Sequence, residues 1–325
     1  MLIGISGNIC AGKSEVATYL KFQGFQRLYI KGSTSADYNP SKVTKPNSDL
    51  KFDSVEELVD YVTKRWLNHF VVDIQDLNTL EVLSKRPFFL HIAVDAPLLT
   101  RYERYKSRFS GEATIPSLED FVKLNDNFMY SHEKSMAVVS SQSKVMLVNQ
   151  MDGIEQLYVR LSKLNLLSTE RLRPSWDAYF MRLAGLAALR SNCMKRRVGC
   201  VLVRDKSVIA TGYNGTPRGL PNCNEGGCTR CNSGNGSGSE LSTCLCLHAE
   251  ENALVEAGRD RVGSRAVLYC NTCPCLTCSI KIVQVGIKEV VYSQSYSMDD
   301  ASAKVLQAGG IILRQYSPPS HGVVL

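Results

Sequence analysis

The chain has 325 residues, of which 44% are hydrophobic and 21% charged, and its formal net charge is +7. This length allows two domains with separate cores, and the composition excludes a disordered or fibrous protein. No cationic stretch leads into an apolar run with a cleavage site, and no apolar run approaches membrane-spanning length. We therefore expect no membrane partner and a cytoplasmic protein, with the nucleus as an alternative. The chain has twelve cysteines, and those that cluster in the sequence are then expected to bind metal rather than form disulfides.

The first expected elements form a phosphate-binding motif. Residues 2–6 are a short apolar strand, residues 7–14 read Gly-Asn-Ile-Cys-Ala-Gly-Lys-Ser, and a helical stretch follows at 15–22. This order of strand, loop and helix is the context that Gly-x-x-x-x-Gly-Lys-Ser needs. The functional residues of the motif are Gly7, Gly12, Lys13 and Ser14. The glycines let backbone N–H groups surround phosphate oxygens, the lysine neutralises their charge, and the serine hydroxyl can bind Mg²⁺.

Two further apolar strands are expected at 70–74 and 88–94, followed by a helix with three arginines on one face. These arginines are Arg101, Arg104 and Arg108. With its motif, the region resembles the P-loop nucleotide and nucleoside kinases, dephospho-coenzyme A kinase among them. The resemblance implies a parallel-sheet domain over residues 1–165 that binds ATP or another nucleotide. Three roles stay open for it: an active kinase, a nucleotide-binding regulatory module, or a structural relic.

The second half alternates between helical and strand patterns, which predicts an α/β sandwich. A polar stretch at 168–173 predicts a linker, and the second domain is expected to span residues 170–325. The expected helices cover 176–189, 248–258 and 275–285. The expected strands cover 198–203, 208–212, 266–270 and 288–292, the first two as a hairpin. Residues 233–239 contain only Gly, Ser and Asn, and predict a flexible loop.

Most of the positive charge lies in this second half. Through Lys163 the chain has 20 basic and 19 acidic residues, and after it 18 basic and 12 acidic residues. The basic residues form short clusters, Lys195-Arg196-Arg197 and Arg259/Arg261/Arg265. We favour pockets for phosphorylated small molecules over a polyanion-binding surface or an ordinary solvated face.

Two short motifs indicate the chemistry of the protein: His248-Ala-Glu250 and Pro274-Cys275-Leu-Thr-Cys278. One imidazole and two thiolates are three ligands for tetrahedral Zn²⁺, which leaves the fourth position open for water, as in catalytic zinc sites. Zinc lowers the pKa of water toward neutrality, and Glu250 lies close enough in sequence to move its protons. This His-x-Glu…Pro-Cys-x-x-Cys pattern is the signature of the zinc nucleobase deaminases. A purely structural zinc site would leave the carboxylate unexplained.

Residues from about 174 to 315 resemble the deoxycytidylate (dCMP) deaminases, close to their fungal members. The segments that carry the resemblance are Asn192–Cys200, Gly212–Pro217, Cys246–Ala253 and Thr272–Cys275. The resemblance implies hydrolysis of dCMP to dUMP, which supplies thymidylate (dTMP) synthesis. It also implies a homohexamer that is activated by dCTP with Mg²⁺ and inhibited by dTTP.

The same resemblance suggests roles for residues outside the zinc motif. Asn214 would bind the nucleotide, and Tyr296 would pack against it. Arg259 would lie at the effector site or a subunit interface, and Lys195 and Arg196 could hold a phosphate of substrate or effector. The alternatives are a turn residue for Asn214, because Asn-Gly is a common turn pair, and an ordinary strand aromatic for Tyr296.

Further cysteines surround the glycine-rich loop, which has few apolar side chains to hold it together. A metal ion bound by these cysteines would hold such a loop in one conformation. The phage and fungal members of the family suggest a second, structural zinc. We favour Cys193, Cys223 and Cys246 with either Cys228 or Cys231 as its ligands, against reduced thiols.

Three other functions compete with this interpretation. A tRNA or single-strand nucleic-acid deaminase would need a broad basic surface or stacking aromatics, and only 8% of the residues are aromatic, so nucleic acid is not an expected partner. A bifunctional salvage enzyme would add phosphorylation by an active N-terminal kinase. A non-catalytic regulatory protein is disfavoured by the complete set of zinc ligands and the accompanying glutamate.

Overall fold

The chain folds into two compact units. The computed structural model describes residues 1–31, 50–108, 116–131, 135–150, 153–234, 236, 239–295, 299–317 and 322–324. The first unit contains Met1–Leu172 together with the C-terminal strand β12 (Gly322–Val324), and the second contains Arg173–Pro319. Within the described residues, no helix is both long and apolar enough to cross a bilayer.

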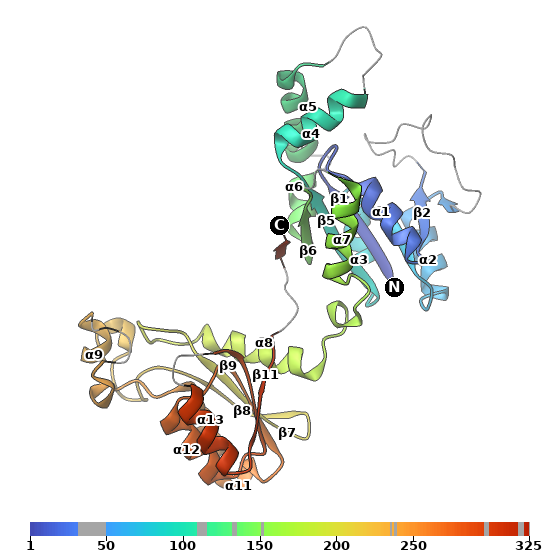
Figure 1. Ribbon diagram of the computed structural model, residues 1–325. Helices are drawn as coiled ribbons and strands as arrows, with labels where there is room; N and C mark the ends of the chain where they lie inside the picture. Colours follow the sequence, from blue (N-terminus) through green and yellow to red (C-terminus); the bar gives the residue numbers. More distant parts are fainter. Residues whose placement is uncertain are drawn as a thin grey trace. The chain divides into compact units, whose positions relative to one another are not determined.

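The first unit is built on a seven-stranded sheet in the order β12-β6-β5-β1-β4-β2-β3 (Figure 1). All its strand pairs are parallel. Besides β12, the strands are β1 (Leu2–Gly7), β2 (Gln26–Ile30), β3 (Leu50–Phe52), β4 (Phe70–Asp73), β5 (Phe89–Asp95) and β6 (Val145–Val148). The helices are α1 (Lys13–Phe22), α2 (Val55–Lys64), α3 (Leu77–Ser84), α4 (Leu98–Arg108), α5 (Leu118–Tyr130), α6 (Met136–Ser141) and α7 (Ile154–Leu164).

Helices cover both faces of this sheet, which is why its central strands are almost entirely apolar. Ile3 and Ile5 of β1 pack in one buried cluster with residues of α1 and α7. Leu2 points to the other face and packs with residues of α2, α3 and α6. Because side chains alternate along a strand, a single short strand contributes to two cores.

The second unit is a three-layer sandwich around a five-stranded sheet in the order β11-β10-β9-β7-β8. Strand β7 is antiparallel to β8 and β9, whereas β9, β10 and β11 run parallel. The strands are β7 (Gly199–Arg204), β8 (Ser207–Tyr213), β9 (Ala266–Thr272), β10 (Glu289–Gln294) and β11 (Ile312–Gln315). The longer helices are α8 (Trp176–Ala188), α10 (Ala249–Ala257), α12 (Leu276–Val285) and α13 (Asp299–Ala308). The short ones are η1 (Thr169–Arg171), which precedes this unit, and η2 (Cys223–Glu225), α9 (Thr229–Asn232), η3 (Leu241–Thr243) and α11 (Arg259–Val262).

Successive side chains of β7 point to opposite faces of the sheet, and each face packs against a different layer of helices. Cys200 and Leu202 pack in a cluster with residues of α10, α12 and α13. Val201 and Val203 pack on the opposite face with Phe180 of α8. Figure 1 shows α8 on one side of the sheet and α12 and α13 on the other. The two zinc-motif helices, α10 and α12, therefore share one face of the sheet.

The end of the chain differs from the expected domain boundaries. Residues 170–325 were expected to form one domain, but β12 pairs with β6 of the first unit, with Gly322 opposite Val145. Strand β6 offers an open edge there, and a terminal segment with backbone N–H and C=O groups to pair can extend it. The chain thus returns to its first unit after completing the second.

Candidate active site and metal centres

The three expected ligands of the catalytic zinc come together at the start of two helices. His248 is the N-cap residue of α10 and Cys275 is the N-cap residue of α12, with Cys278 in the first turn. The Sγ atoms of Cys275 and Cys278 both lie 3.3 Å from Nδ1 of His248. Both thiols lie at the N-terminal end of α12, where the helix dipole favours thiolates.

These three side chains fit a tetrahedral zinc ion. Zinc–sulfur bonds of about 2.3 Å and a zinc–nitrogen bond of about 2.0 Å place sulfur and nitrogen about 3.5 Å apart at a tetrahedral angle. The observed 3.3 Å agrees with this value, and the three ligand atoms all lie within 4.8 Å of one another. The set leaves one tetrahedral position for a fourth ligand.

The protonation of these groups also favours a bound cation. A hydrogen bond with Cys278 lowers the pKa of Cys275 to about 3, and the same contact raises the pKa of Cys278. A hydrogen bond with Cys275 raises the pKa of His248 to about 9. Three donor atoms thus share protons at short range, and a divalent cation between them would replace those protons.

Glu250 lies beside these ligands in a buried position. Only 3% of its surface is exposed, and burial raises the pKa of its carboxyl to about 7. A carboxyl with a pKa near neutrality both accepts and donates protons at cellular pH, which is what a general acid and base requires.

A neighbouring glutamate has a structural role that the sequence reasoning missed. Oε2 of Glu251 accepts a hydrogen bond from the backbone N–H of His248 at 2.9 Å, and Oε1 pairs with Lys281 of α12. Glu251 therefore joins the two zinc-motif helices and fixes the backbone of one ligand. The signal was present, because a glutamate at the third position of a helix commonly forms such a capping box.

Asn214 binds protein backbone in the structure. Its Oδ1 accepts from the N–H of Val198 at 2.8 Å, and its Nδ2 donates to the carbonyl of Arg196 at 2.7 Å. The side chain is buried and fastens the loop that carries Lys195 and Arg196, the expected phosphate-binding cluster. Arg196 also donates to Oε1 of Gln294 at 3.2 Å.

The remaining expected substrate and effector residues do not join this loop in the described structure. Arg259 is exposed at the start of α11. Tyr296 lies outside the described residues. Part of the expected flexible loop at 233–239 also lies outside them.

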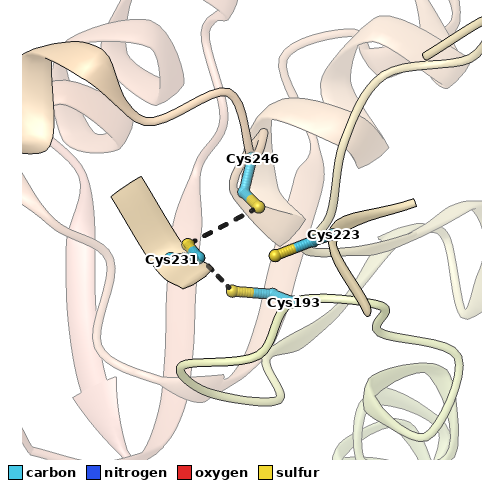
Figure 2. A group of neighbouring side chains, drawn as sticks. All are labelled: Cys193, Cys223, Cys231 and Cys246. Atoms are coloured by element: carbon cyan, nitrogen blue, oxygen red, sulfur yellow. Dashed lines mark hydrogen bonds between the residues drawn. The ribbon is translucent and has the colours of Figure 1, made fainter. Parts of the chain in front are cut away.

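A second group of cysteines, at positions where they could hold a metal ion, lies around the short helix α9. The sulfur atoms of Cys193, Cys223, Cys231 and Cys246 all lie within 4.8 Å of one another (Figure 2). The set contains the three cysteines that were expected as ligands and takes Cys231 rather than Cys228 as the fourth. Cys228 belongs to a second, overlapping set with Cys231, Cys244 and Cys246.

The first unit has a cavity at the expected phosphate-binding loop. Its volume is about 330 Å³, and Gly12, Lys13, Ser14, Arg104 and Arg108 are among the residues that line it. The loop joins β1 to α1, as the motif requires. The Lys13 ammonium donates to the backbone carbonyls of Gly7 and Asn8, at 3.1 and 2.6 Å.

A glycine is required where this loop begins. Gly7 has a φ of +136°, and a Cβ there would lie 1.9 Å from the carbonyl oxygen of Val94. Only a residue without a side chain fits this conformation and contact. Two of the three expected arginines reach the cavity, whereas Arg101 is buried elsewhere and donates to Oδ1 of Asn125 at 2.6 Å.

Comparisons with known proteins agree with this site. Residues 174–294 match the family described as the cytidine and deoxycytidylate deaminase zinc-binding region. The chain is 50% identical to the deoxycytidylate deaminase of Schizosaccharomyces pombe over 323 residues, which cover 99% of each protein. It is 52% identical over 274 residues to that of Saccharomyces cerevisiae, covering 82% of this chain and 86% of the relative. The deoxycytidylate deaminase of Mycobacterium phage D29 is 44% identical over 126 residues, covering 37% of this chain and 95% of the relative.

The similarity to the S. pombe protein runs through both units, while the family match contains all three zinc ligands and Glu250. The chain therefore belongs to the deoxycytidylate deaminases of the zinc-dependent cytidine and deoxycytidylate deaminase family.

Proposed function

We propose that the protein hydrolyses dCMP to dUMP and ammonia. The observation that carries this proposal is that the sulfur atoms of Cys275 and Cys278 each lie 3.3 Å from Nδ1 of His248, with Glu250 buried beside them. The relatives named above bear the name of this activity. The product dUMP would supply dTMP synthesis.

The chain contributes a proton carrier at a buried site. Zinc held by the three ligands supplies a Lewis acid that lowers the pKa of water. Glu250 accepts a proton from the attacking water and donates it to the ring nitrogen next to the carbon that bears the amino group. The water oxygen bonds to that carbon. Glu250 then carries the remaining proton of the water to the amino group, and the carbon–nitrogen bond breaks to release ammonia. Burial of the carboxyl suits this role, because it keeps the pKa near neutrality.

The loop held by Asn214 is the proposed site for the 5′-phosphate of dCMP. Lys195 and Arg196 lie on this loop, and a guanidinium suits a phosphate because it donates two parallel hydrogen bonds. The bonds from Asn214 to the backbone at Arg196 and Val198 keep the loop in one conformation. Asn214 would then act on the substrate through the loop as well as by any contact of its own.

Ammonia release from four substrates tests this proposal. The purified zinc-loaded chain is incubated with dCMP, CMP, deoxycytidine and a cytosine-containing oligonucleotide. We expect turnover of dCMP well above that of the other three, because only dCMP has both the deoxyribose and a single terminal phosphate. Preference for the oligonucleotide would favour the nucleic-acid deaminase, and no release from any substrate would exclude the proposed reaction.

We also propose that the first unit binds the phosphates of a nucleotide. The cavity of about 330 Å³ with Lys13, Arg104 and Arg108 in its lining supports this, as does the glycine turn before α1. Calorimetric titration with ATP and Mg²⁺, with and without a nucleoside acceptor, tests the proposal. Binding without consumption of ATP would favour a regulatory module over a kinase.

Regulation and assembly belong to the same proposal. Activation by dCTP with Mg²⁺, inhibition by dTTP, and a homohexamer are what the family relationship suggests. Arg259 is exposed at the start of α11, where it is accessible to an effector or a neighbouring subunit. Activity measured with each triphosphate, together with light scattering, would test these points.

We further propose a structural zinc ion bound by Cys193, Cys223, Cys231 and Cys246. Four cysteine thiolates are a common closed ligand set for structural zinc. The set supports the segment that leads into the catalytic ligand His248, since Cys246 lies two residues before it.

A further inference from the structure

Six cysteines around α9 form two overlapping sets of four. The first set is Cys193, Cys223, Cys231 and Cys246, and the second is Cys228, Cys231, Cys244 and Cys246. Within each set, the four sulfur atoms lie within 4.8 Å of one another. Cys231 and Cys246 belong to both sets, and the other four cysteines belong to one each. Figure 2 shows the first set, with the two shared residues joined by a dashed line.

We propose that these six cysteines bind two zinc ions, with the thiolates of Cys231 and Cys246 bridging the pair. Cys193 and Cys223 would complete the tetrahedron of one ion, and Cys228 and Cys244 that of the other. The proposal adds a third zinc ion to the chain, beyond the catalytic ion and the single structural ion proposed above. Loading the site displaces six thiol protons and changes no oxidation state.

The sulfur–sulfur distances match zinc tetrahedra. With zinc–sulfur bonds of about 2.3 Å, two ligands of one tetrahedron lie about 3.8 Å apart. The shared edge, from Cys231 to Cys246, measures 3.9 Å. In the first set Cys193 lies 3.9 Å from Cys231, and in the second set Cys244 lies 3.8 Å from Cys231.

The pair of sulfur atoms that only the second ion would use is also correctly spaced. Cys228 and Cys244 lie 4.0 Å apart. A disulfide would require about 2.05 Å between them, so these two sulfur atoms are not bonded to each other. A single ion at the first set leaves these two sulfur atoms at ligand spacing without a ligand role.

The segment also lacks the apolar side chains that would otherwise hold it. The buried cluster here contains only cysteines: Cys223, Cys228, Cys231 and Cys246, with Cys193 and Cys244 packed against them. Leu220 and Leu245, two of the few large apolar residues nearby, are each 48% exposed. Hydrogen bonds such as those from Asn232 to the carbonyls of Cys223 and Cys228 help to order this loop, and bonds to metal ions would add the stabilisation that a core of large apolar side chains supplies elsewhere.

Donors around the sulfur atoms suit the negative charge of the assembly. Six thiolates and two Zn²⁺ ions carry a net charge of −2. The backbone N–H of Met194 donates to Cys223, and those of Cys231 and Leu245 donate to Cys228. The buried guanidinium of Arg230 lies beside Cys231 and Cys244 and adds a positive charge.

The bridging position of Cys246 connects the cluster to the catalytic site. The next residue, Leu247, exchanges two backbone hydrogen bonds with Gly215, at 2.8 and 3.2 Å. His248 follows directly and binds the catalytic zinc. Both proposed metal centres therefore hold the ends of a three-residue segment, which would keep the imidazole in place.

Metal content and cadmium NMR test the proposal on the full-length chain. Protein purified under reducing conditions with zinc should contain three zinc ions per chain by mass spectrometry. Replacement with ¹¹³Cd should give three resonances, two of which split each other through the shared sulfur atoms. Two zinc ions per chain, or three cadmium signals without mutual splitting, would overturn it. Ammonia release from dCMP in the same sample keeps this outcome separate from the deaminase proposal.

A double variant locates the second ion of the pair. Cys228→Ser with Cys244→Ser removes both unshared ligands of one ion and leaves four thiolates for the other. The variant should bind two zinc ions per chain, and its remaining cluster signal should lose its splitting. Retention of three ions would contradict the assignment. Cys10→Ala in the first unit is the control for loss of a buried thiol and should retain three ions. If the double variant fails to fold, the cadmium spectrum of the unmodified chain still shows whether two metal ions share sulfur ligands.

Discussion

The carboxylate of Glu251 accepts a hydrogen bond from the backbone N–H of His248 at 2.9 Å, whereas the adjacent Glu250 is only 3% exposed. The two adjacent glutamates of α10 therefore have different tasks. Glu251 fixes the backbone of a zinc ligand and pairs with Lys281 of α12. Glu250, the more buried of the two, remains for proton transfer.

Glu250→Gln separates proton transfer from zinc binding. The amide has nearly the same shape but cannot accept a proton from water, so kcat for dCMP should fall by about 10²- to 10⁴-fold. Zinc content should stay unchanged, because Glu250 is not among the ligand atoms. Ammonia release and metal analysis measure the two quantities.

The matched control is Glu251→Gln on the same helix turn. The substitution weakens the cap at His248 and the ion pair with Lys281, whose side chain is about half exposed. We therefore expect a loss of about 1 kcal/mol in stability and less than a tenfold change in kcat. Near-normal turnover in Glu250→Gln would remove that residue from the proposed mechanism.

His91 of β5 makes the first unit sensitive to acid. It is buried, its Nε2 lies 2.8 Å from Oγ of Ser6, and burial lowers its pKa to about 4. The folded state thus favours the neutral ring, while the unfolded chain binds a proton near pH 6.5. The contribution of His91 to stability is complete above pH 6.5 and is lost as pH falls toward 4, by up to about 3 kcal/mol.

Urea unfolding between pH 4.5 and 8 measures this effect. His91→Gln keeps a polar side chain that does not titrate, so its unfolding free energy should depend less on pH than that of the unmodified chain. The difference should appear below pH 6.5 and grow toward pH 4.5. Parallel pH curves for the two proteins would contradict the assignment.

The elements around the zinc motif could be predicted from the sequence because their signals are local. The helix expected at 248–258 corresponds to α10 at Ala249–Ala257, and the one expected at 275–285 corresponds to α12 at Leu276–Val285. In both cases a ligand that precedes the helix marks its start. The approach of His248 to Cys278 follows once both helices lie on one face of the sheet.

Contacts between distant segments could not be predicted in the same way. Cys244 was not expected as a ligand, since only folding around α9 brings it within 3.8 Å of Cys231. Arg101 was expected on the same helix face as Arg104, but it is buried and contacts Asn125 of α5. The pairing of β12 with β6 depends on which sheet edge is open, and a three-residue strand carries no sequence signal for that.

Asn214→Ala should weaken both stability and substrate binding. The backbone N–H of Val198 and the carbonyl of Arg196 each lose a partner, which costs about 1–3 kcal/mol. The loop with Lys195 should become less ordered, and KM for dCMP should rise more than kcat falls. Urea unfolding and steady-state kinetics measure these changes.

Asn214→Asp is the matched variant. It keeps the acceptor for Val198 but places a carboxylate oxygen against the carbonyl of Arg196 in a buried site, so its loss of stability should equal or exceed that of Asn214→Ala. A fall in kcat at unchanged stability and KM would show instead that Asn214 acts on the reacting ring itself.

Lys13→Ala should remove nucleotide binding by the first unit. Its ammonium donates to the carbonyls of Gly7 and Asn8 at the N-terminal end of α1, where the helix favours anions. Lys13 also lines the cavity, together with Arg104. A charge-assisted hydrogen bond to phosphate contributes about 1.5–3 kcal/mol, so the Kd for ATP with Mg²⁺ should rise by about 10- to 100-fold. Calorimetric titration measures the Kd.

Lys21→Ala tests whether that loss is specific to the loop. Lys21 lies in the last turn of the same helix, away from the residues that line the cavity, so the Kd for ATP should stay within about twofold of the original. Arg104→Ala should behave like Lys13→Ala, because Arg104 lines the cavity and donates to the carbonyl of Ala11 in the loop at 3.4 Å. Equal binding by all three variants would mean that ATP, if it binds, occupies another part of the chain. Loss of binding in Lys13→Ala and Arg104→Ala alone would locate the phosphates between the loop and α4.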